Sequence, residues 1–205
     1  ARKDLVKMNR ETIIIRPEKT EQYHEMESLV RDAFWDKYTP GCREHLLVHK
    51  LRNSPVLHQE LSFAAEYGGE LAGGIWYADA SLKTQNGIMP VLTMGPVAVA
   101  PRFQNCGIGS ALIRRTLELA SAAPAVLIYG DPGYYSRFGF EPAEKYGITD
   151  AEGGYCPALL IRAFSVVPAG AFSEGEIYCV SAEEADLFDR NFPPRQKHVL
   201  PTQLF

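Results

Sequence analysis

The segment that most constrains the fold lies between residues 91 and 129, where a strand, a loop, a helix and a second strand follow one another. On a helical wheel, residues 108–120 place most of their apolar side chains on one arc: Ile108, Leu112, Ile113, Leu117, Leu119 and Ala120, with Thr116 among them. Pro124 ends this helix. Residues 126–129 then form an unalternating apolar run, which is typical of a strand buried on both faces beside a parallel neighbour. This βαβ unit predicts a mixed α/β fold.

Three elements are predicted in the first 60 residues. Residues 12–16 are a β-branched run stopped by Pro17, which indicates a strand. Residues 18–35 and 43–52 carry apolar side chains at helical spacing and predict two helices.

The middle of the chain predicts antiparallel strands. Alternating apolar residues at 61–67 and 71–77 flank Gly68-Gly69, which indicates a hairpin with a two-residue turn. The next strand, 91–99, is interrupted by Gly95-Pro96, so we expect a bulge or kink there.

After the βαβ unit, residues 131–140 predict a short helix and turn, and two strands are expected at 158–167 and 176–180. Ser181 and Glu184 fit a capping box that opens a helix reaching about residue 191. The tail beyond it is extended and carries the apolar residues Phe192, Val199, Leu200, Leu204 and Phe205, which we do not expect to be all exposed.

Composition excludes several classes of protein. The chain has 205 residues, 46% of them apolar, which suffices for a sizeable core and excludes disordered and fibrous proteins. Its net charge of −4 argues against a nucleic-acid partner or an anionic membrane surface and favours a small-molecule ligand. No apolar run is long enough to span a membrane, and residues 1–10 show no secretion signal. Four scattered cysteines, without a Cys-x-x-Cys pair, are typical of a cytoplasmic protein without a zinc site.

The loop between residues 101 and 110 predicts an anion site. Gly107 and Gly109 lead directly into the amphipathic helix, whose first N–H groups have no intrahelical partner and whose dipole attracts negative charge. Further positive charge is available from Arg102, Arg114 and Arg115. A dinucleotide fingerprint is not complete, because Leu112 occupies the place of its third glycine, and no Gly-Lys-Ser/Thr follows as in a Walker loop.

Two motifs together resemble the GNAT superfamily of N-acetyltransferases. The phrase VAVAP followed by Gln104-x-x-Gly107-x-Gly109 is similar to the acyl-CoA pyrophosphate loop of that superfamily, and Tyr135 stands four residues before Gly139-Phe140, as a tyrosine typically does there. The phrases GPVAVAPRFQNCGIGSALI and GDPGYYSRFGFEPA are most similar to the bacterial YhbS-like branch of predicted acetyltransferases.

The resemblance covers residues 12–167 and implies a central mixed sheet with helices on both faces and a splayed pair of strands that binds acetyl-CoA, with no metal. Residues 168–205 are then a C-terminal extension packed on the same domain or on the partner in a homodimer. The positions implied to hold the co-substrate are Val97, Ala98, Val99, Gln104, Asn105, Cys106, Gly107, Ile108, Gly109 and Ser110.

The implied reaction is a direct attack of a primary amine on the thioester in a ternary complex. A backbone N–H near Val97 would stabilise the oxyanion, and Tyr135 would protonate the leaving thiolate, with Tyr134 as the rival acid. Arg137 would either contact a CoA phosphate or be solvated. The acceptor is a small-molecule or protein amine.

The general base is left open. Glu44, His49 and Glu60 lie in the region that shapes the acceptor site in GNAT proteins, and none is singled out. His45 and His49 would share a helix face, but a metal site needs a third ligand that the sequence does not indicate. Because no base stands out, a non-catalytic acyl-CoA-binding sensor is the alternative function. A nucleotide-dependent oxidoreductase is a weaker one.

Overall fold

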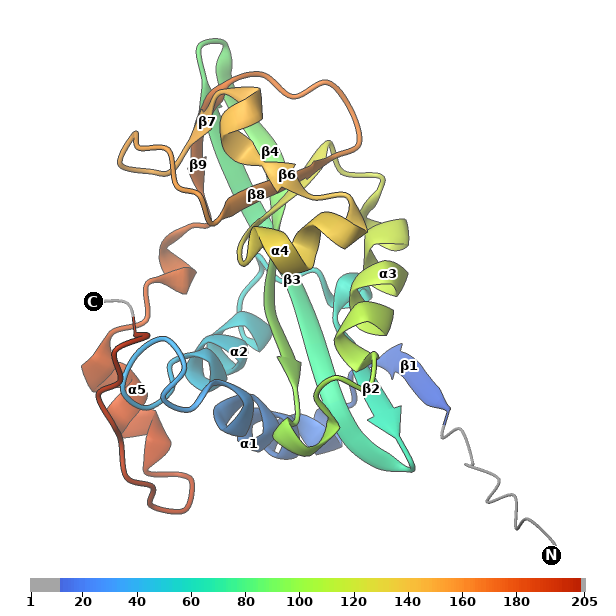
Figure 1. Cartoon of the computed structure of the whole chain (residues 1–205), viewed down its shortest axis with the longest axis vertical. Coiled ribbons are helices and arrows are strands. Elements are labelled where there is room, and N and C mark those ends of the chain that lie inside the picture. Colours follow the sequence, from blue (N-terminus) through green and yellow to red (C-terminus); the bar gives the residue numbers. More distant parts are fainter. Residues whose placement is uncertain (1–11, 204–205) are drawn as a thin grey trace, which may run out of the picture.

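The computed structural model describes residues 12–203, and it is organised around one nine-stranded sheet (Figure 1). The strand order is β1-β2-β3-β4-β5-β8-β6, and β9 pairs with both β3 and β7. The pairs β4–β5 and β7–β9 are parallel and the other pairs are antiparallel, so the sheet is mixed. The strands are β1 Ile13–Pro17, β2 Phe63–Tyr67, β3 Glu70–Thr84, β4 Gly87–Val99, β5 Ala125–Tyr129, β6 Glu141–Pro142, β7 Ile148–Thr149, β8 Leu159–Ala163 and β9 Gly170–Ser173.

Helices cover both faces of this sheet (Figure 1). They are α1 Tyr23–Phe34, α2 Glu44–Arg52, α3 Ile108–Ala120, α4 Pro132–Tyr135 and α5 Ala182–Asp189. Six short 3₁₀ helices connect the elements: Thr20–Gln22, Gln59–Leu61, Pro101–Phe103, Ser136–Phe138, Ala143–Tyr146 and Glu176–Tyr178. Within residues 12–203, no helix combines the length and the apolarity that crossing a bilayer requires.

Alternation along β3 divides the core between the two helical layers. Ile75 and Tyr77 pack with α3 on one face, whereas Trp76 and Ala78 pack with α1 and α2 on the other. Tyr77 is fully buried, and its hydroxyl lies 2.8 Å from the hydroxyl of Thr116 on α3, so the phenol is buried with a hydrogen-bond partner.

The predicted helix at 108–120 is confirmed with its bounds, and most of its predicted inner face is buried. Leu119 is the exception: its side chain is 41% exposed, so its place in the core was wrongly predicted. Gly109 is buried instead. A helical wheel assigns every residue of the apolar arc to the buried face. One face of a sheet covers only part of that arc, so a residue at its edge can stay exposed.

The predicted hairpin is also confirmed. Gly68 and Gly69 have φ values of 60° and 79° and connect β2 to β3, as a two-residue turn with two left-handed positions requires.

The strand predicted at 176–180 is wrong. Gly175, with a φ of 86°, turns the chain away from the sheet, and the next residues form a 3₁₀ helix. The additional strand lies earlier, at β9, where Gly170 lets the chain approach β3 closely: a Cβ there would lie 2.6 Å from the carbonyl oxygen of Lys83.

The parallel pairing of β4 with β5 is short, and the opening that it leaves determines where the candidate site lies. The two strands pair only at Leu92 with Val126 and at Thr93 with Leu127, and beyond these residues they separate. The irregularity expected at Gly95-Pro96 is confirmed: the β3–β4 register shifts opposite residues 75–77, and Gly95 has a φ of 147°.

The C-terminal segment packs on α1, α2 and the loop that follows α1 (Figure 1). The capping box is present, since Ser181 and Glu184 each accept the backbone N–H of the other. Asp189, near the end of α5, forms an ion pair with Arg31 at 2.6 Å.

The tail is packed only in part. Phe192 is buried, whereas Val199 is 73% exposed and Leu200 40%, so the expectation that these apolar residues are not all exposed is confirmed through Phe192. Leu204 and Phe205, like residues 1–11, lie outside the described residues.

His45 makes the stability of this packing depend on pH. Burial lowers the pKa of its imidazole to about 4, although Asp189 lies 3.3 Å away and opposes the shift. The unfolded chain, with a histidine pKa near 6.5, therefore binds the proton first, and the free energy of unfolding should fall as the pH decreases from about 6.5 to about 4.

We expect His45 to contribute up to about a tenfold change in the unfolding constant per pH unit in that range. Urea unfolding of the wild type and of His45→Leu between pH 7.5 and 4.5 measures it. The two proteins should differ in the slope of stability against pH, and equal slopes would contradict this account.

Candidate active site

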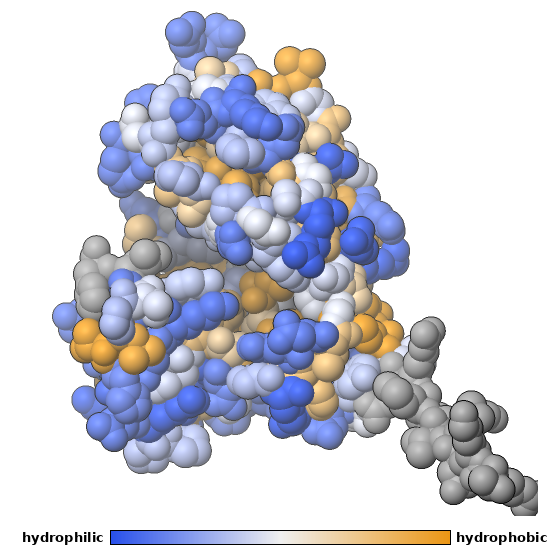
Figure 2. All heavy atoms as spheres, viewed as in Figure 1, coloured by the Kyte–Doolittle hydropathy of each residue, from blue (hydrophilic) through white to orange (hydrophobic). Residues whose placement is uncertain are grey.

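A cavity of about 650 Å³ opens where β4 and β5 separate. Its walls come from α1 and the loop after it, from β4, from the start of α3 and from the segment between β5 and the 3₁₀ turn after α4. Figure 2 shows the molecule hollowed between its upper and lower halves at this position. The lining residues are Ala33, Phe34, Lys37, Tyr38, Val97, Val99, Phe103, Gln104, Asn105, Gly107, Ile108, Gly109, Ser110, Tyr129, Gly130, Asp131, Tyr134, Tyr135 and Arg137.

Backbone N–H groups at the start of α3 face this cavity. Gly107 occupies the N-cap position with a φ of 85°, and no side chain forms a capping hydrogen bond there. Asn105, two residues earlier, also has a positive φ, of 64°. The first intrahelical bond runs from Ala111 N–H to the Gly107 carbonyl, so the preceding N–H groups of the first turn are free of helical partners. The cavity wall can therefore accommodate an anion.

Most of the predicted co-substrate positions line the cavity, but two do not. Along β4, Val97 and Val99 face it, whereas the side chain of Ala98 is buried in the core on the other face of the sheet. Cys106 is exposed and its thiol lies 3.7 Å from the carbonyl oxygen of Gln104, outside the lining. Both could contribute to the site only through their backbone.

The two tyrosines that compete for the role of acid stand in different places. The ring of Tyr135 packs over Gly130. A Cβ on residue 130 would lie 2.4 Å from this ring, so only a glycine there permits the ring position. The hydroxyl of Tyr134 lies 3.1 Å from the point where a Cβ on Gly109 would sit, which places it beside the first turn of α3. The two rings meet edge to face, with centroids 5.0 Å apart.

Burial raises the pKa of Tyr135, and the nearby Tyr134, Tyr38 and Asp131 add to the shift. The phenol therefore keeps its proton throughout the neutral range, which is the state in which it can donate.

The positive charge near the cavity does not come from the arginines that the sequence suggested. Arg102 forms an ion pair with Glu70, and Arg115 lies 3.9 Å from Glu118. Lys37 and Arg137 line the cavity instead.

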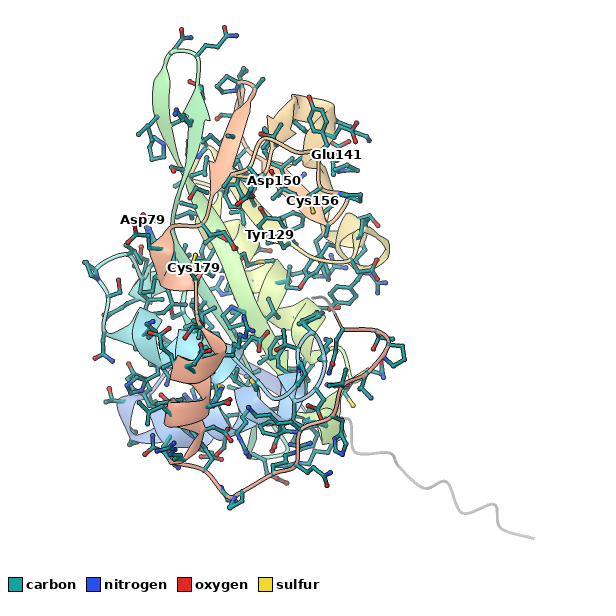
Figure 3. The ribbon with its side chains drawn as sticks, turned by 90° about the vertical axis from the view of Figure 1, so that its left-hand side faces the viewer. Asp79, Tyr129, Glu141, Asp150, Cys156 and Cys179 are labelled. Carbon is teal, nitrogen blue, oxygen red and sulfur yellow. The ribbon has the colours of Figure 1, made fainter. Side chains whose placement is uncertain are left out.

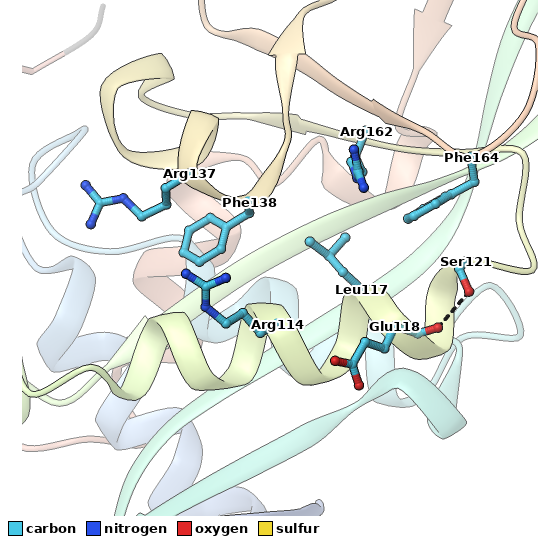
Figure 4. Close-up of a pocket in the computed structure, with 8 residues that line it drawn as sticks. All are labelled: Arg114, Leu117, Glu118, Ser121, Arg137, Phe138, Arg162 and Phe164. Carbon is cyan, nitrogen blue, oxygen red and sulfur yellow. Dashed lines mark hydrogen bonds between the residues drawn. The ribbon is translucent and has the colours of Figure 1, made fainter.

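Arg114 faces a second, smaller pocket of about 310 Å³ between α3 and β8 (Figure 4). Its guanidinium lies 5.2 Å from the centre of the Phe138 ring, and Arg162 lines the same pocket. Arg137 borders both pockets: it extends away from Arg162 in Figure 4, and its guanidinium lies 4.8 Å from the centre of the Tyr134 ring.

None of the three residues considered as a general base lines the cavity. Glu44 accepts a hydrogen bond from the thiol of Cys42, His49 lies 3.0 Å from Glu27, and Glu60 lies 2.9 Å from His58. In the described part of the chain, no group of three His, Cys, Asp or Glu side chains is arranged to hold a metal ion.

The loop of residues 35–43 lies in the region expected to shape the acceptor site, but the sequence did not single out the residues that line the cavity. This loop contributes Lys37 and Tyr38 to the cavity wall, and its position depends on Asp36, whose carboxylate accepts the Gly41 N–H at 2.7 Å and lies 2.8 Å from His198 of the tail. Although burial opposes the shift, these two hydrogen bonds lower the pKa of Asp36. Only the tertiary structure brings the tail to this loop.

The fold and the cavity together define a protein of the acyltransferase class, with a parallel strand pair that opens over a glycine-rich helix start. The profile described as "Acetyltransferase (GNAT) domain" matches residues 14–143, so the chain belongs to this family.

Relatives from Escherichia coli agree with the YhbS-like resemblance, which is thereby confirmed. The uncharacterized N-acetyltransferase YjhQ of strain K12 is 32% identical over 102 residues, which are 49% of this chain and 56% of YjhQ, little more than half its length. The uncharacterized N-acetyltransferase YhbS of the same strain is 29% identical over 119 residues, 57% of this chain and 70% of YhbS.

Two solved structures share the fold. A GNAT family acetyltransferase from Brucella melitensis, in complex with acetyl-CoA, is 26% identical with a TM-score of 0.67, and the match covers 82% of this chain and 98% of that one. YhbS from Escherichia coli, in complex with CoA, is 24% identical with a TM-score of 0.70, over 82% and 92% of the two chains.

Proposed function

We propose that this protein is an N-acetyltransferase that transfers an acetyl group from acetyl-CoA to a primary amine. The observation that carries the proposal is the cavity at the opening of β4 and β5, where free N–H groups of α3 lie together with Val97 and Val99 of β4 and with the two candidate acids, Tyr134 and Tyr135. Membership of the GNAT family and the acetyl-CoA bound to the Brucella relative support it.

In this proposal, acetyl-CoA lies with its pantetheine arm along β4. The backbone of Val97, Ala98 and Val99 would pair with the arm, whose amides need hydrogen-bond partners. The pyrophosphate would be held by N–H groups between Gln104 and Ser110, including those of Asn105, Cys106, Gly107, Ile108 and Gly109. This arrangement places the thioester at the strand opening.

The chemistry follows from the groups that surround this point. A neutral amine attacks the thioester carbonyl, and the negative charge that develops on the carbonyl oxygen is stabilised by a backbone N–H near Val97. As this intermediate collapses, the C–S bond breaks and the nitrogen loses a proton to solvent. Tyr135 then donates its proton to the leaving thiolate. Its partly buried, protonated phenol supports this role over that of a base.

A transfer assay tests the function. The protein is incubated with acetyl-CoA and a panel of spermidine, tyramine, aniline and a lysine-containing peptide, and free thiol and acetylated product are both measured. We expect thiol and product to appear in equal amounts for at least one amine. Binding of acetyl-CoA without product from any amine would favour the sensor, and binding of NAD without CoA would favour the oxidoreductase.

Arg137 provides a prediction on CoA binding. Because its guanidinium borders the cavity near the start of α3, we expect it to contact a CoA phosphate, and Arg137→Gln should weaken CoA binding by about three- to tenfold. The salt dependence of affinity should also become shallower, since one charge contact is lost.

Arg162→Gln is the matched control, because Arg162 lines only the second pocket. Calorimetric titration with CoA at two salt concentrations separates the variants. Equal affinities for the wild type and Arg137→Gln would show that Arg137 is simply solvated.

We also propose that residues 12–167 form the GNAT-like acyltransferase domain, with 168–205 as a C-terminal extension that packs on it and fixes the loop after α1. The contacts of His198 and Asp189 with that region support this division. The free thiols of the four cysteines support a reducing compartment, the cytoplasm, as its location.

A further inference from the structure

Glu174 stands at the point where β4 and β5 separate. It is the residue after β9, and its carboxylate accepts a hydrogen bond of 3.0 Å from the hydroxyl of Thr93. Thr93 belongs to the last residue pair that joins the two strands. Two residues further along β4, the carbonyl of Gly95 accepts a 3.1 Å hydrogen bond from Tyr178, so the segment 174–178 covers the apex of the opening.

One of the residues that neighbour Glu174 also lines the cavity. Tyr129, at the end of β5, lines the cavity and lies close enough to Glu174 that burial and this carboxylate both raise its pKa. Tyr178 faces the same carboxylate, and the pKa of its phenol is raised by burial and by Glu174. The remaining titratable groups around Tyr129 are Asp150, Glu152 and Cys156, and Figure 3 shows Asp150 and Cys156 beside it.

Glu174 also lacks a positive partner. It is half-buried, and among the ion pairs of residues 12–203 none involves it. Burial therefore raises the pKa of this carboxyl, and only the Thr93 hydroxyl opposes the shift. Like Glu44, His49 and Glu60, Glu174 is not itself a lining residue, but it neighbours the lining residue Tyr129 and so can reach the acceptor through water. Glu44, His49 and Glu60 are instead paired with Cys42, Glu27 and His58.

We propose that Glu174 is the general base of the transfer. This inference rests on the proposed function and assigns the proton acceptor that the three earlier candidates do not supply. Glu174 takes one proton from the ammonium group of the acceptor, and the nitrogen lone pair then forms the C–N bond as the C–S bond breaks. As the amide forms, the nitrogen releases its second proton to solvent, Tyr135 protonates the thiolate and regains a proton from solvent, and Glu174 returns its proton to solvent. The products are the amide, free CoA and one proton.

Glu174→Gln tests the role with little structural change, because the amide oxygen can still accept the hydrogen bond from Thr93. We expect kcat for an alkylamine that the wild type acetylates, such as tyramine, to fall by about 10²-fold or more, with CoA affinity unchanged. The acid limb of the kcat profile, which reports the base in the ternary complex, should be lost or displaced. Glu176→Gln, an exposed carboxylate in the same segment, is the control and should behave as the wild type.

A second acceptor separates proton transfer from packing. Aniline is already neutral at pH 7 and needs no base to remove an ammonium proton, so its acetylation should fall much less in Glu174→Gln than that of tyramine. An equal fall for both amines, or a wild-type kcat and an unchanged acid limb with tyramine, would overturn the assignment while leaving the proposed function intact. A wild type that binds acetyl-CoA but acetylates no amine of the panel would overturn both.

Discussion

Replacing Tyr135 by phenylalanine is expected to lower kcat by about 10²-fold or more while leaving CoA affinity nearly unchanged. The variant keeps the ring that packs against Gly130 and Phe140, with centroids of the two aromatic rings 5.9 Å apart, and removes only the hydroxyl. A structural role would therefore leave turnover close to that of the wild type. Steady-state rates at saturating amine and acetyl-CoA, with CoA titration alongside, measure the effect.

Tyr134→Phe is the matched control, because its hydroxyl lies beside Gly109 at the start of α3. It should affect CoA affinity more than kcat. Since burial raises the pKa of Tyr135, its ionisation should not limit the rate below about pH 10, the ordinary value for tyrosine. A large loss of kcat in Tyr134→Phe with normal turnover in Tyr135→Phe would reverse the assignment.

Gly107→Val should weaken CoA binding by at least tenfold, about 1.4 kcal/mol. Nothing lies within 4 Å of the position where its Cβ would be built, so the new side chain would enter open space in the cavity wall where the pyrophosphate is proposed to bind. A β-branched residue is also strained at a φ of 85°, by about 1–3 kcal/mol.

Gly153→Val separates the two effects. Gly153 has a φ of 88°, also has nothing within 4 Å, and does not line the cavity. Both variants should lose similar stability on thermal unfolding, and only Gly107→Val should lose CoA affinity in titrations of the folded protein. Unchanged affinity in Gly107→Val would contradict the proposed pyrophosphate loop.

Local patterns were enough to predict the elements that surround the cavity. The period of α3, the Gly68-Gly69 turn and the interruption at Gly95-Pro96 each follow from residues close together in the chain. The strand expected at 176–180 failed because its short apolar run does not reveal that Gly175 turns the chain away.

The walls of the site depend on contacts that the sequence does not reveal. Glu174 lies 81 residues from its partner Thr93, and His198 lies 162 residues from Asp36. No periodicity links such distant positions. The same limit explains why Arg102 was expected near the anion site: its pairing with Glu70 arises only once β3 and the loop after β4 are folded.

Amide hydrogen exchange with and without acetyl-CoA tests the central claim most directly, because it reports where on the chain the co-substrate binds. The account predicts slower exchange of backbone amides in residues 95–99 and 104–110 with acetyl-CoA, and no such change with NAD. Unchanged exchange in both segments at a saturating concentration of acetyl-CoA, or protection confined to other parts of the chain, would contradict it.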